Sequence, residues 1–134
     1  MLMIGNGSGL GAVMAVARDA LRHDHTGPIH LYHGSHHADG LYHRTELKAM
    51  AAAHGNFHYV PYVSGDEYLN DDRPSRSDDV DLAGHTELPG WRVFLCGYAP
   101  MVHSAKKAAY LAGAALNDIY ADPYELRELR ARPR

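Results

Sequence analysis

Short apolar runs alternate along this chain with longer stretches in which apolar side chains recur every three or four positions. The apolar runs predict five strands, at residues 1–4, 29–33, 57–63, 91–96 and 118–121. The longer stretches predict three helices, at residues 12–22, 41–53 and 100–112. Strands that alternate with helices favour a parallel sheet that is covered on both faces.

Proline and aspartate residues refine the ends of these elements. Asp39 is expected to cap the second helix, and Pro100 suits the first turn of the last one. Pro61 places its strand at an edge of the sheet, because proline cannot donate a hydrogen bond to a neighbouring strand. The polar segment 64–78 is predicted to be a long mobile loop, and the acidic residues after it are expected to open a short helix.

Ligands of such sheets bind where the carboxyl ends of the strands meet. In this chain those ends are residues 5–11, 34–37, 64–66 and 96–100, and each contains glycine or a small polar residue. Neither a repeat nor a linker marks a second domain. We therefore interpret residues 1–124 as one domain, followed by a charged tail at 125–134.

Composition narrows the class of protein. The 134 residues are enough for one core, and a net charge of −3 gives no reason to expect nucleic acid as a partner. No apolar run approaches the roughly 20 residues that span a bilayer, and residues 1–4 lack the basic leader of a signal peptide, so we expect no membrane partner. The single cysteine, Cys96, cannot form an internal disulfide, which suits the cytoplasm.

Eleven histidines raise the question of a metal site. Most of them lie in the first half of the chain, but no cysteine joins them there and no acidic residue falls at a recognised ligand spacing. We therefore expect solvated or locally hydrogen-bonded histidines and no metal.

Glycines stand at alternate positions directly after the first strand, at Gly5, Gly7, Gly9 and Gly11. A glycine-rich turn between a strand and a helix lets backbone amides approach an anion, although a tight turn without a ligand has the same sequence. A P-loop is excluded, because no Gly-Lys-Ser/Thr follows. A Rossmann fingerprint fits poorly, because Leu10 stands where its third glycine belongs.

Four segments match the motifs of a known family. Residues 7–12, GSGLGA, are similar to a Gly-Thr-Gly-Ile-Ala-Pro loop, and residues 93–102, VFLCGYAPMV, resemble a Cys-Gly-x-x-x-Met signature. Residues 31–47, LYHGSHHADGLYHRTEL, look like the second strand with its turn and helix, and residues 117–124, NDIYADPY, look like the closing strand. Together they resemble the ferredoxin–NADP reductase family, and in particular the reductase components of bacterial oxygenases.

The resemblance implies a three-layer αβα sandwich with a five-stranded parallel sheet in the order 3-2-1-4-5. It also implies that three loops contact a dinucleotide. The implied contacts are Gly7, Ser8, Gly9 and Leu10 at the pyrophosphate, Gly34, Ser35, His36 and Ser64 on the adenosine side, and Cys96, Gly97, Tyr98, Pro100, Met101 and Tyr124 around the nicotinamide. Cys96 would position the nicotinamide ring without acting as a nucleophile. A Gly9→Val variant is expected to lose the dinucleotide and to keep its fold.

Simpler interpretations of three of these residues stay open. His36 is also compatible with an exposed turn residue, Cys96 with a small buried side chain, and Tyr124 with a surface tyrosine. The chain also departs from the family pattern, since His36 replaces an arginine and Ser64-Gly65 replaces the Ser-Arg pair of NADP-specific members. Without an arginine fork a 2′-phosphate lacks its usual partner, so NADH is expected over NADPH.

The resemblance further implies what the chain does. It would orient NAD(P)H for hydride transfer to FAD, and the flavin would sit in a domain or subunit that these 134 residues do not contain. Electrons would then pass to an iron–sulfur protein or an oxygenase. The chain is expected to be part of a flavin-dependent oxidoreductase and to be inactive by itself. The alternative is a stand-alone dinucleotide-binding or assembly module without turnover.

Overall fold

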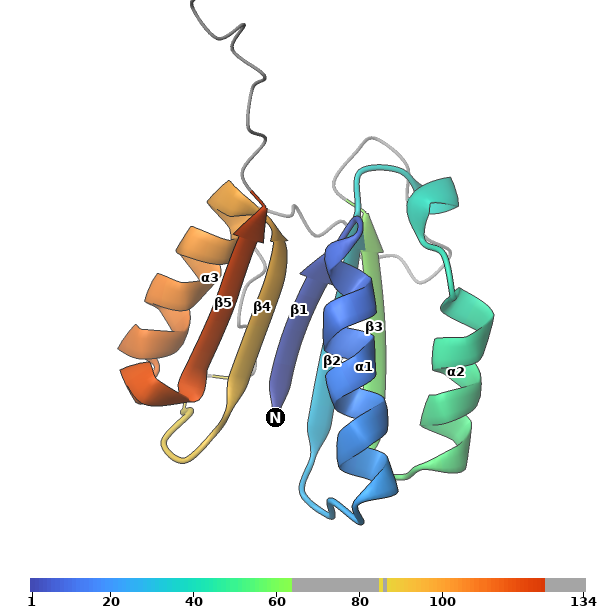
Figure 1. Ribbon diagram of the computed structural model, residues 1–134, viewed down its shortest axis with the longest axis horizontal. Helices are drawn as coiled ribbons and strands as arrows, with labels where there is room; N and C mark the ends of the chain where they lie inside the picture. The colour runs from blue at the N-terminus through green and yellow to red at the C-terminus, as the bar shows by residue number, and fades with distance from the viewer. Residues whose placement is uncertain (64–84, 86, 125–134) are drawn as a thin grey trace, which may run out of the picture.

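The computed structural model describes residues 1–63, 85 and 87–124. Five strands form one parallel sheet in the order β3-β2-β1-β4-β5 (Figure 1). The strands are β1 (Leu2–Asn6), β2 (Ile29–Ser35), β3 (Phe57–Val63), β4 (Val93–Tyr98) and β5 (Ile119–Tyr124). The predicted strand order is confirmed, and the strand that contains Pro61 lies at an edge as expected.

Three α-helices cover this sheet, with α1 (Gly9–Arg22) and α2 (Arg44–Ala53) on one face and α3 (Ala99–Leu111) on the other. Short 3-10 turns, η1 (Ala38–Gly40) and η3 (Leu116–Asp118), precede α2 and β5. The predicted three-layer αβα arrangement is therefore confirmed. Pro100 lies in the first turn of α3, where its missing amide costs no intrahelical bond.

Two hydrophobic cores flank the sheet, and alternate residues of the central strand β1 feed both of them. Met3 lies in the core beneath α1 and α2, together with Leu10 and Leu31. Leu2 and Ile4 point to the other face and pack against α3. All five side chains are fully buried, and burial of such a side chain stabilises the fold by roughly 1.5–3 kcal/mol. The cores therefore fix the strands and helices whose ends form the site.

Two element starts differ from the sequence-based expectation. Helix α1 begins at Gly9, three residues before the predicted start, because Gly9 has no side chain and its turn packs directly on β4. The expected cap at Asp39 is wrong: Asp39 lies in η1, and α2 begins at Arg44. His43 precedes it in a left-handed conformation with φ of 57° and makes no side-chain cap bond.

The remaining sequence-based expectations lie partly outside the described residues. These are the predicted loop at 64–78, the short helix after it and the tail at 125–134. Within the described part of the chain, no helix combines the length and the apolar character needed to cross a membrane.

Candidate functional site

The carboxyl ends of the strands meet the N-termini of all three helices at one edge of the sheet (Figure 1). In the sheet register Gly5 pairs with both His33 and Cys96, and Asn6 pairs with Gly34. The predicted glycine loop, the turn after β2 and the turn after β4 are therefore neighbours. Helix N-termini carry a partial positive charge, so this edge favours an anion.

The start of α1 lies directly against the last residues of β4. A Cβ atom on Gly9 would overlap the carbonyl oxygen of Cys96 and would lie 2.8 Å from the amide nitrogen of Gly97. Any side chain at position 9 must therefore move α1 away from β4. This overlap counts against the expectation that Gly9→Val would keep its fold.

The exposed part of the loop consists of Gly7 and Ser8. Ser8 is the N-cap residue of α1 and makes no side-chain cap bond. The first amides of a helix have no intrahelical acceptor, so the amides at Ser8 and Gly9 can donate to a bound anion. The side chain of Leu10 is fully buried, and its amide donates a long 3.4 Å hydrogen bond to the Gly7 carbonyl.

A tyrosine that the sequence analysis did not single out braces this loop. The hydroxyl of Tyr42 donates to the carbonyl of Gly7 at 2.6 Å, across 35 residues of sequence. The Tyr42 ring lies edge-on to the buried ring of His33, with centroids 5.8 Å apart. His33 Nδ1 lies 2.7 Å from the hydroxyl of Tyr59 on β3. The loop is thereby anchored through two side chains to the next strands of the sheet.

Cys96 lies at the end of β4 with its thiol beside two polar groups of β5. Its Sγ is 3.4 Å from the Tyr124 hydroxyl and 3.9 Å from Oδ2 of Asp122. Burial raises the pKa of the Cys96 thiol. The contact with Cys96 raises the pKa of Tyr124 to about 12. Both groups therefore stay protonated near neutral pH, which suits contact with a neutral ring better than nucleophilic attack.

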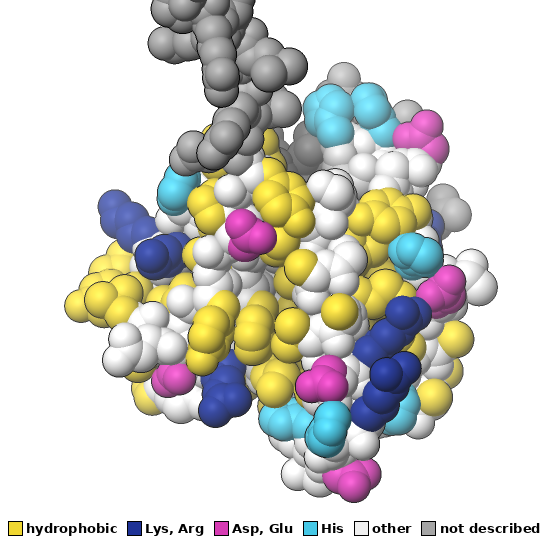
Figure 2. All heavy atoms as spheres, in the orientation of Figure 1, with side chains coloured by type: hydrophobic (Ala, Val, Ile, Leu, Met, Phe, Trp, Pro, Cys, Tyr) yellow, Lys and Arg dark blue, Asp and Glu magenta, His cyan; other side chains and the backbone are white. Residues whose placement is uncertain are grey.

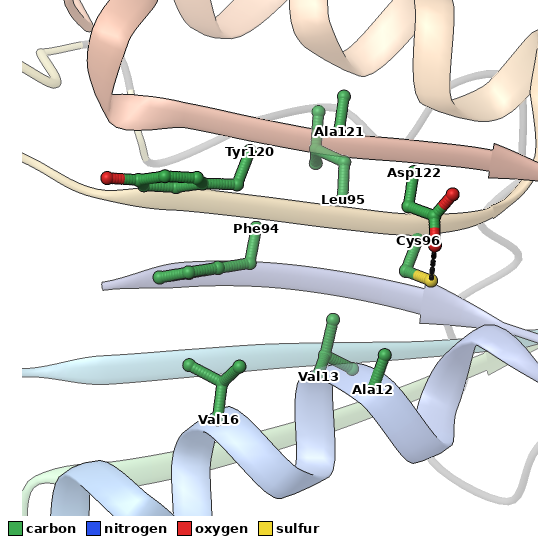
Figure 3. Close-up of a pocket in the computed structure, with 9 residues that line it drawn as sticks. All are labelled: Ala12, Val13, Val16, Phe94, Leu95, Cys96, Tyr120, Ala121 and Asp122. Atoms are coloured by element: carbon green, nitrogen blue, oxygen red, sulfur yellow. Dashed lines mark hydrogen bonds between the residues drawn. The ribbon is translucent and has the colours of Figure 1, made fainter.

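An apolar groove of about 160 Å³ extends from Cys96 between α1 and the last two strands. Its walls include Ala12 and Val16 from α1, Phe94 from β4, and Tyr120 and Asp122 from β5. Figure 3 shows Cys96 and Asp122 at one end of the groove and the rings of Phe94 and Tyr120 at the other. The two rings are stacked with centroids 5.0 Å apart. Hydrophobic side chains gather around the same part of the surface (Figure 2).

The other predicted contacts lie at the same edge but differ in exposure. Tyr98 and Tyr124 are exposed, whereas the Met101 side chain is buried in the core on the α3 face. Gly34 is buried, and a Cβ there would overlap the ring of Tyr62, so packing alone explains a glycine at this position.

In the turn after β2, His36 is exposed beside His37, with ring centroids 4.4 Å apart. Ser35 is partly buried, and its Oγ lies close to Gly40 of the following 3-10 turn. Ser64 lies outside the described residues. The roles of these residues at a ligand stay predictions.

Three residues at the site were missed by the sequence analysis: Asn6, Tyr42 and Asp122. Asn6 is the last residue of β1 and accepts a hydrogen bond from the Tyr98 amide at 2.8 Å. A polar side chain between two glycines at a strand end is the one local signal that pointed to it. Tyr42 and Asp122 carry no such signal, because their contacts depend on how distant segments pack.

The histidines form pairs and not a metal centre in the part of the chain that is described. No three His, Cys, Asp or Glu side chains among these residues are grouped so as to hold a metal ion. His30 stacks on His58 with centroids 4.6 Å apart and meets the ring of His85 edge-on at 4.7 Å. The site at the strand ends therefore presents helix amides, a protonated thiol and aromatic rings, which suit a ligand with both anionic and planar parts.

Comparison with known proteins agrees with this chemistry. The sequence profile described as "Oxidoreductase NAD-binding domain" matches residues 3–107. The chain is 32% identical over 124 residues to the ferredoxin–NAD(P)+ reductase component of the naphthalene 1,2-dioxygenase system of Pseudomonas putida, a match that covers 92% of this chain and 38% of that protein. It is 33% identical over 108 residues to the reductase subunit of an aromatic O-demethylase from Amycolatopsis, covering 81% and 32% respectively.

Solved structures show the same likeness. The Amycolatopsis cytochrome P450 reductase GcoB superposes with a TM-score of 0.83 at 29% identity, over 92% of this chain and 37% of that one. The ferredoxin–NADP+ reductase of Plasmodium falciparum shares the fold, with a TM-score of 0.73 at 15% identity over 92% and 51%. The chain thus spans less than half the length of the curated relatives named above.

Proposed function

The chain belongs to the oxidoreductase NAD-binding domain family, and on that premise we propose that it binds NADH at the carboxyl edge of its sheet and holds the nicotinamide for a flavin on a partner domain or subunit. Membership confirms the resemblance to the reductase components of oxygenase systems. It also makes the chain part of an oxidoreductase that uses a pyridine nucleotide.

The packing of α1 on the last residues of β4 is the observation that carries this proposal. The contact of Gly9 with the backbone of Cys96 and Gly97 brings the first amides of α1 next to the strand end that carries the thiol. A dinucleotide has an anionic pyrophosphate and a neutral reduced nicotinamide a short distance apart. The amides of Ser8 and Gly9 suit the first, and the apolar side of Cys96 suits the second.

The chain's own residues would bind and orient the cofactor and would not react with it. Bound NADH supplies a hydride, and a flavin accepts it. The raised pKa of Cys96 keeps its thiol neutral, so no thiolate forms beside the ring. Tyr124 holds that thiol through their 3.4 Å contact and closes the site on the β5 side.

The apolar groove supports the placement of a flavin-bearing partner on this face. It begins at Cys96 and continues over Phe94 and Tyr120, of which Tyr120 is 49% exposed (Figures 2 and 3). A partner that covered the groove would approach the nicotinamide at the Cys96 end of the groove. The names of the relatives support a ferredoxin or an oxygenase as the final electron acceptor.

A stand-alone dinucleotide-binding module remains the second candidate function. The braced loop favours it, because the Tyr42 contact with Gly7 assembles the anion site from residues of this chain. Dinucleotide binding is common to both candidates, and turnover with a flavoprotein separates them.

The test of dinucleotide binding removes one backbone donor. Ser8 has φ of −66°, which proline adopts, so Ser8→Pro deletes the amide N–H with little change of backbone. Loss of a hydrogen bond to a charged group costs about 1.5–3 kcal/mol, so we expect NADH affinity to fall about 10- to 100-fold by calorimetric titration.

Ser8→Ala is the matched control, since it removes the hydroxyl and keeps the amide. We expect its NADH affinity to stay within about threefold of the wild type, because no cap bond uses the hydroxyl. Circular dichroism and thermal unfolding of both variants check the fold. Equal NADH affinity of folded Ser8→Pro and the wild type would place the pyrophosphate elsewhere.

A further inference from the structure

The side chain of Asn6 joins the two halves of the site. Asn6 is the last residue of β1 and directly precedes the exposed glycine loop. Its Oδ1 accepts a hydrogen bond of 2.8 Å from the backbone amide of Tyr98, 92 positions further along the chain. Tyr98 ends β4 and is the N-cap residue of α3. One side chain therefore bonds the turn after β4 to the end of β1.

Gly97 shows that this contact is built into the backbone. Its φ is +133°, a conformation that L side chains rarely adopt. A Cβ atom on Gly97 would overlap Oδ1 of Asn6 and would lie 2.7 Å from the Asn6 carbonyl oxygen. The Asn6 amide thus occupies the space that a side chain at position 97 would need. The hydrogen bond and this close packing are two separate observations that Asn6 contacts the Gly97–Tyr98 segment.

We propose that Asn6 is a positioning residue for the nicotinamide half of the site. By fixing the Gly97–Tyr98 peptide, it sets where Cys96 and the first turn of α3 lie relative to the amides of Ser8 and Gly9. This inference rests on the proposed function. It adds that one residue, absent from the predicted contacts, determines how the planar end of the cofactor is held.

The expected effect is selective for one end of the ligand. Without Oδ1 the Tyr98 amide loses its acceptor, and the turn that carries Cys96 is free to shift. The pyrophosphate loop keeps its own brace, because Tyr42 holds Gly7 independently of Asn6. Removal of the Asn6 side chain should therefore weaken contact with the nicotinamide and spare contact with the ADP part.

The experiment compares NADH with ADP-ribose, which has the same pyrophosphate but no nicotinamide. For Asn6→Ala of the full 134-residue chain, we expect the NADH affinity to fall at least threefold and the ADP-ribose affinity to stay within twofold. Saturation-transfer NMR gives a second readout: the signal of the nicotinamide protons should fall at least threefold relative to the adenine protons.

Asn6→Asp is the conservative control. It keeps an acceptor oxygen for Tyr98 and adds a negative charge that weakens both ligands alike, so the NADH to ADP-ribose affinity ratio should return to the wild-type value. If Asn6→Ala fails to fold, Asn6→Ser takes its place, because its hydroxyl is too short to reach the Tyr98 amide.

The outcomes separate this inference from the proposed function. A wild-type chain that binds neither NADH nor ADP-ribose refutes both. A wild-type chain that binds the two ligands equally, with no saturation of the nicotinamide protons, overturns the role proposed for Asn6. That result would still support binding of the ADP part of the ligand. Equal weakening of both ligands in folded Asn6→Ala also overturns it, since that result indicates a general structural role.

Discussion

At the scale of single residues, Gly9 and Gly97 show why glycine patterns predict less than they suggest. Both look like parts of a ligand loop, yet each lacks a side chain because another part of the protein occupies the space. For Gly9 the neighbour is the backbone of β4, and for Gly97 it is the side chain of Asn6. Gly7 is exposed and has a φ of 53°, whereas Gly11 is exposed within α1. The sequence therefore located the loop, but only packing separates structural from ligand-facing glycines.

We propose that the turn after β2 decides the choice between NADH and NADPH. The 2′-phosphate of NADPH carries close to two negative charges and is best held by a fixed arginine fork. In this turn His36 lies next to His37, so neither position holds an arginine. The positive charge of Arg44, at the start of α2, acts on Tyr59. We therefore expect tighter binding of NADH than of NADPH at pH 8.

Paired calorimetric titrations with both cofactors at pH 8 test this choice. His36→Arg is the informative variant, since it restores the missing fork and should raise NADPH affinity about 3- to 10-fold with little change for NADH. Tighter NADPH binding by the wild type at pH 8 would contradict the preference. An unchanged NADPH affinity in His36→Arg would show that the ribose lies away from this turn.

At the scale of elements, strand β2 is unusual because a histidine, His33, occupies one of its buried positions. Its burial pattern alternates, and the sequence predicted a strand, but alternation does not reveal which neighbours a histidine has. His33 is fully buried between Tyr42 and Tyr59. Burial lowers its pKa to about 4, and the positive potential of His43 acts in the same direction. In the folded protein the imidazole of His33 is therefore neutral near pH 7.

This burial predicts acid-sensitive stability. Between pH 6.5 and 4 the unfolded chain binds a proton at His33 that the folded chain does not bind, so the stabilising contribution is complete above about pH 6.5 and is lost as the pH falls. The loss at His33 alone amounts to about 2 kcal/mol between pH 7.5 and 5. Urea unfolding at several pH values measures it.

His33→Phe should flatten this dependence, because it removes the titrating group and keeps an aromatic ring in the core. It should also lower stability at pH 7.5, because the hydroxyl of Tyr59 loses its partner. His103→Gln is the control, since His103 is exposed on α3 and its replacement should leave the contribution of His33 in place. A His33→Phe slope equal to that of the wild type would assign the acid sensitivity to other groups.

At the scale of the whole molecule, the sequence predicted the strand order, the three layers and the edge where the site lies. The layers and the edge follow from long apolar patterns and from strand–helix alternation, which average over many residues, whereas the strand order was implied by the resemblance to the ferredoxin–NADP reductase family. The start of α2 could not be predicted, because Asp39 looks like a cap while the chain turns at His43 with a positive φ. Tyr42 and Asp122 were missed for a related reason, since Tyr42 reaches Gly7 across 35 positions and Asp122 reaches Cys96 across 26.

The last prediction concerns whether the 134-residue chain can oxidise NADH by itself. NADH gives up two electrons as a hydride, so a catalyst must present a two-electron acceptor within about 3–3.5 Å of the nicotinamide. The side chains of this sequence contain no such acceptor: a disulfide, the two-electron acceptor that protein side chains can form, needs two cysteines, and Cys96 is the only one. Its raised pKa also makes it a poor nucleophile.

We therefore expect the purified chain to be colourless, to bind NADH, and to oxidise it with ferricyanide only at the background rate. Addition of a flavin-bearing partner that covers the groove beside Cys96 should start oxidation of NADH. Tyr120→Lys should lower this rate by weakening binding of the partner. It should leave NADH affinity unchanged, because the Tyr120 ring lies at the opposite end of the groove from the Cys96 thiol. An intact flavoprotein reductase serves as the positive control in the same assay. Stoichiometric flavin in the purified chain, or NADH oxidation without added flavoprotein, would show that the chain holds its own electron acceptor. The proposal that a separate domain or subunit supplies the flavin would then be wrong.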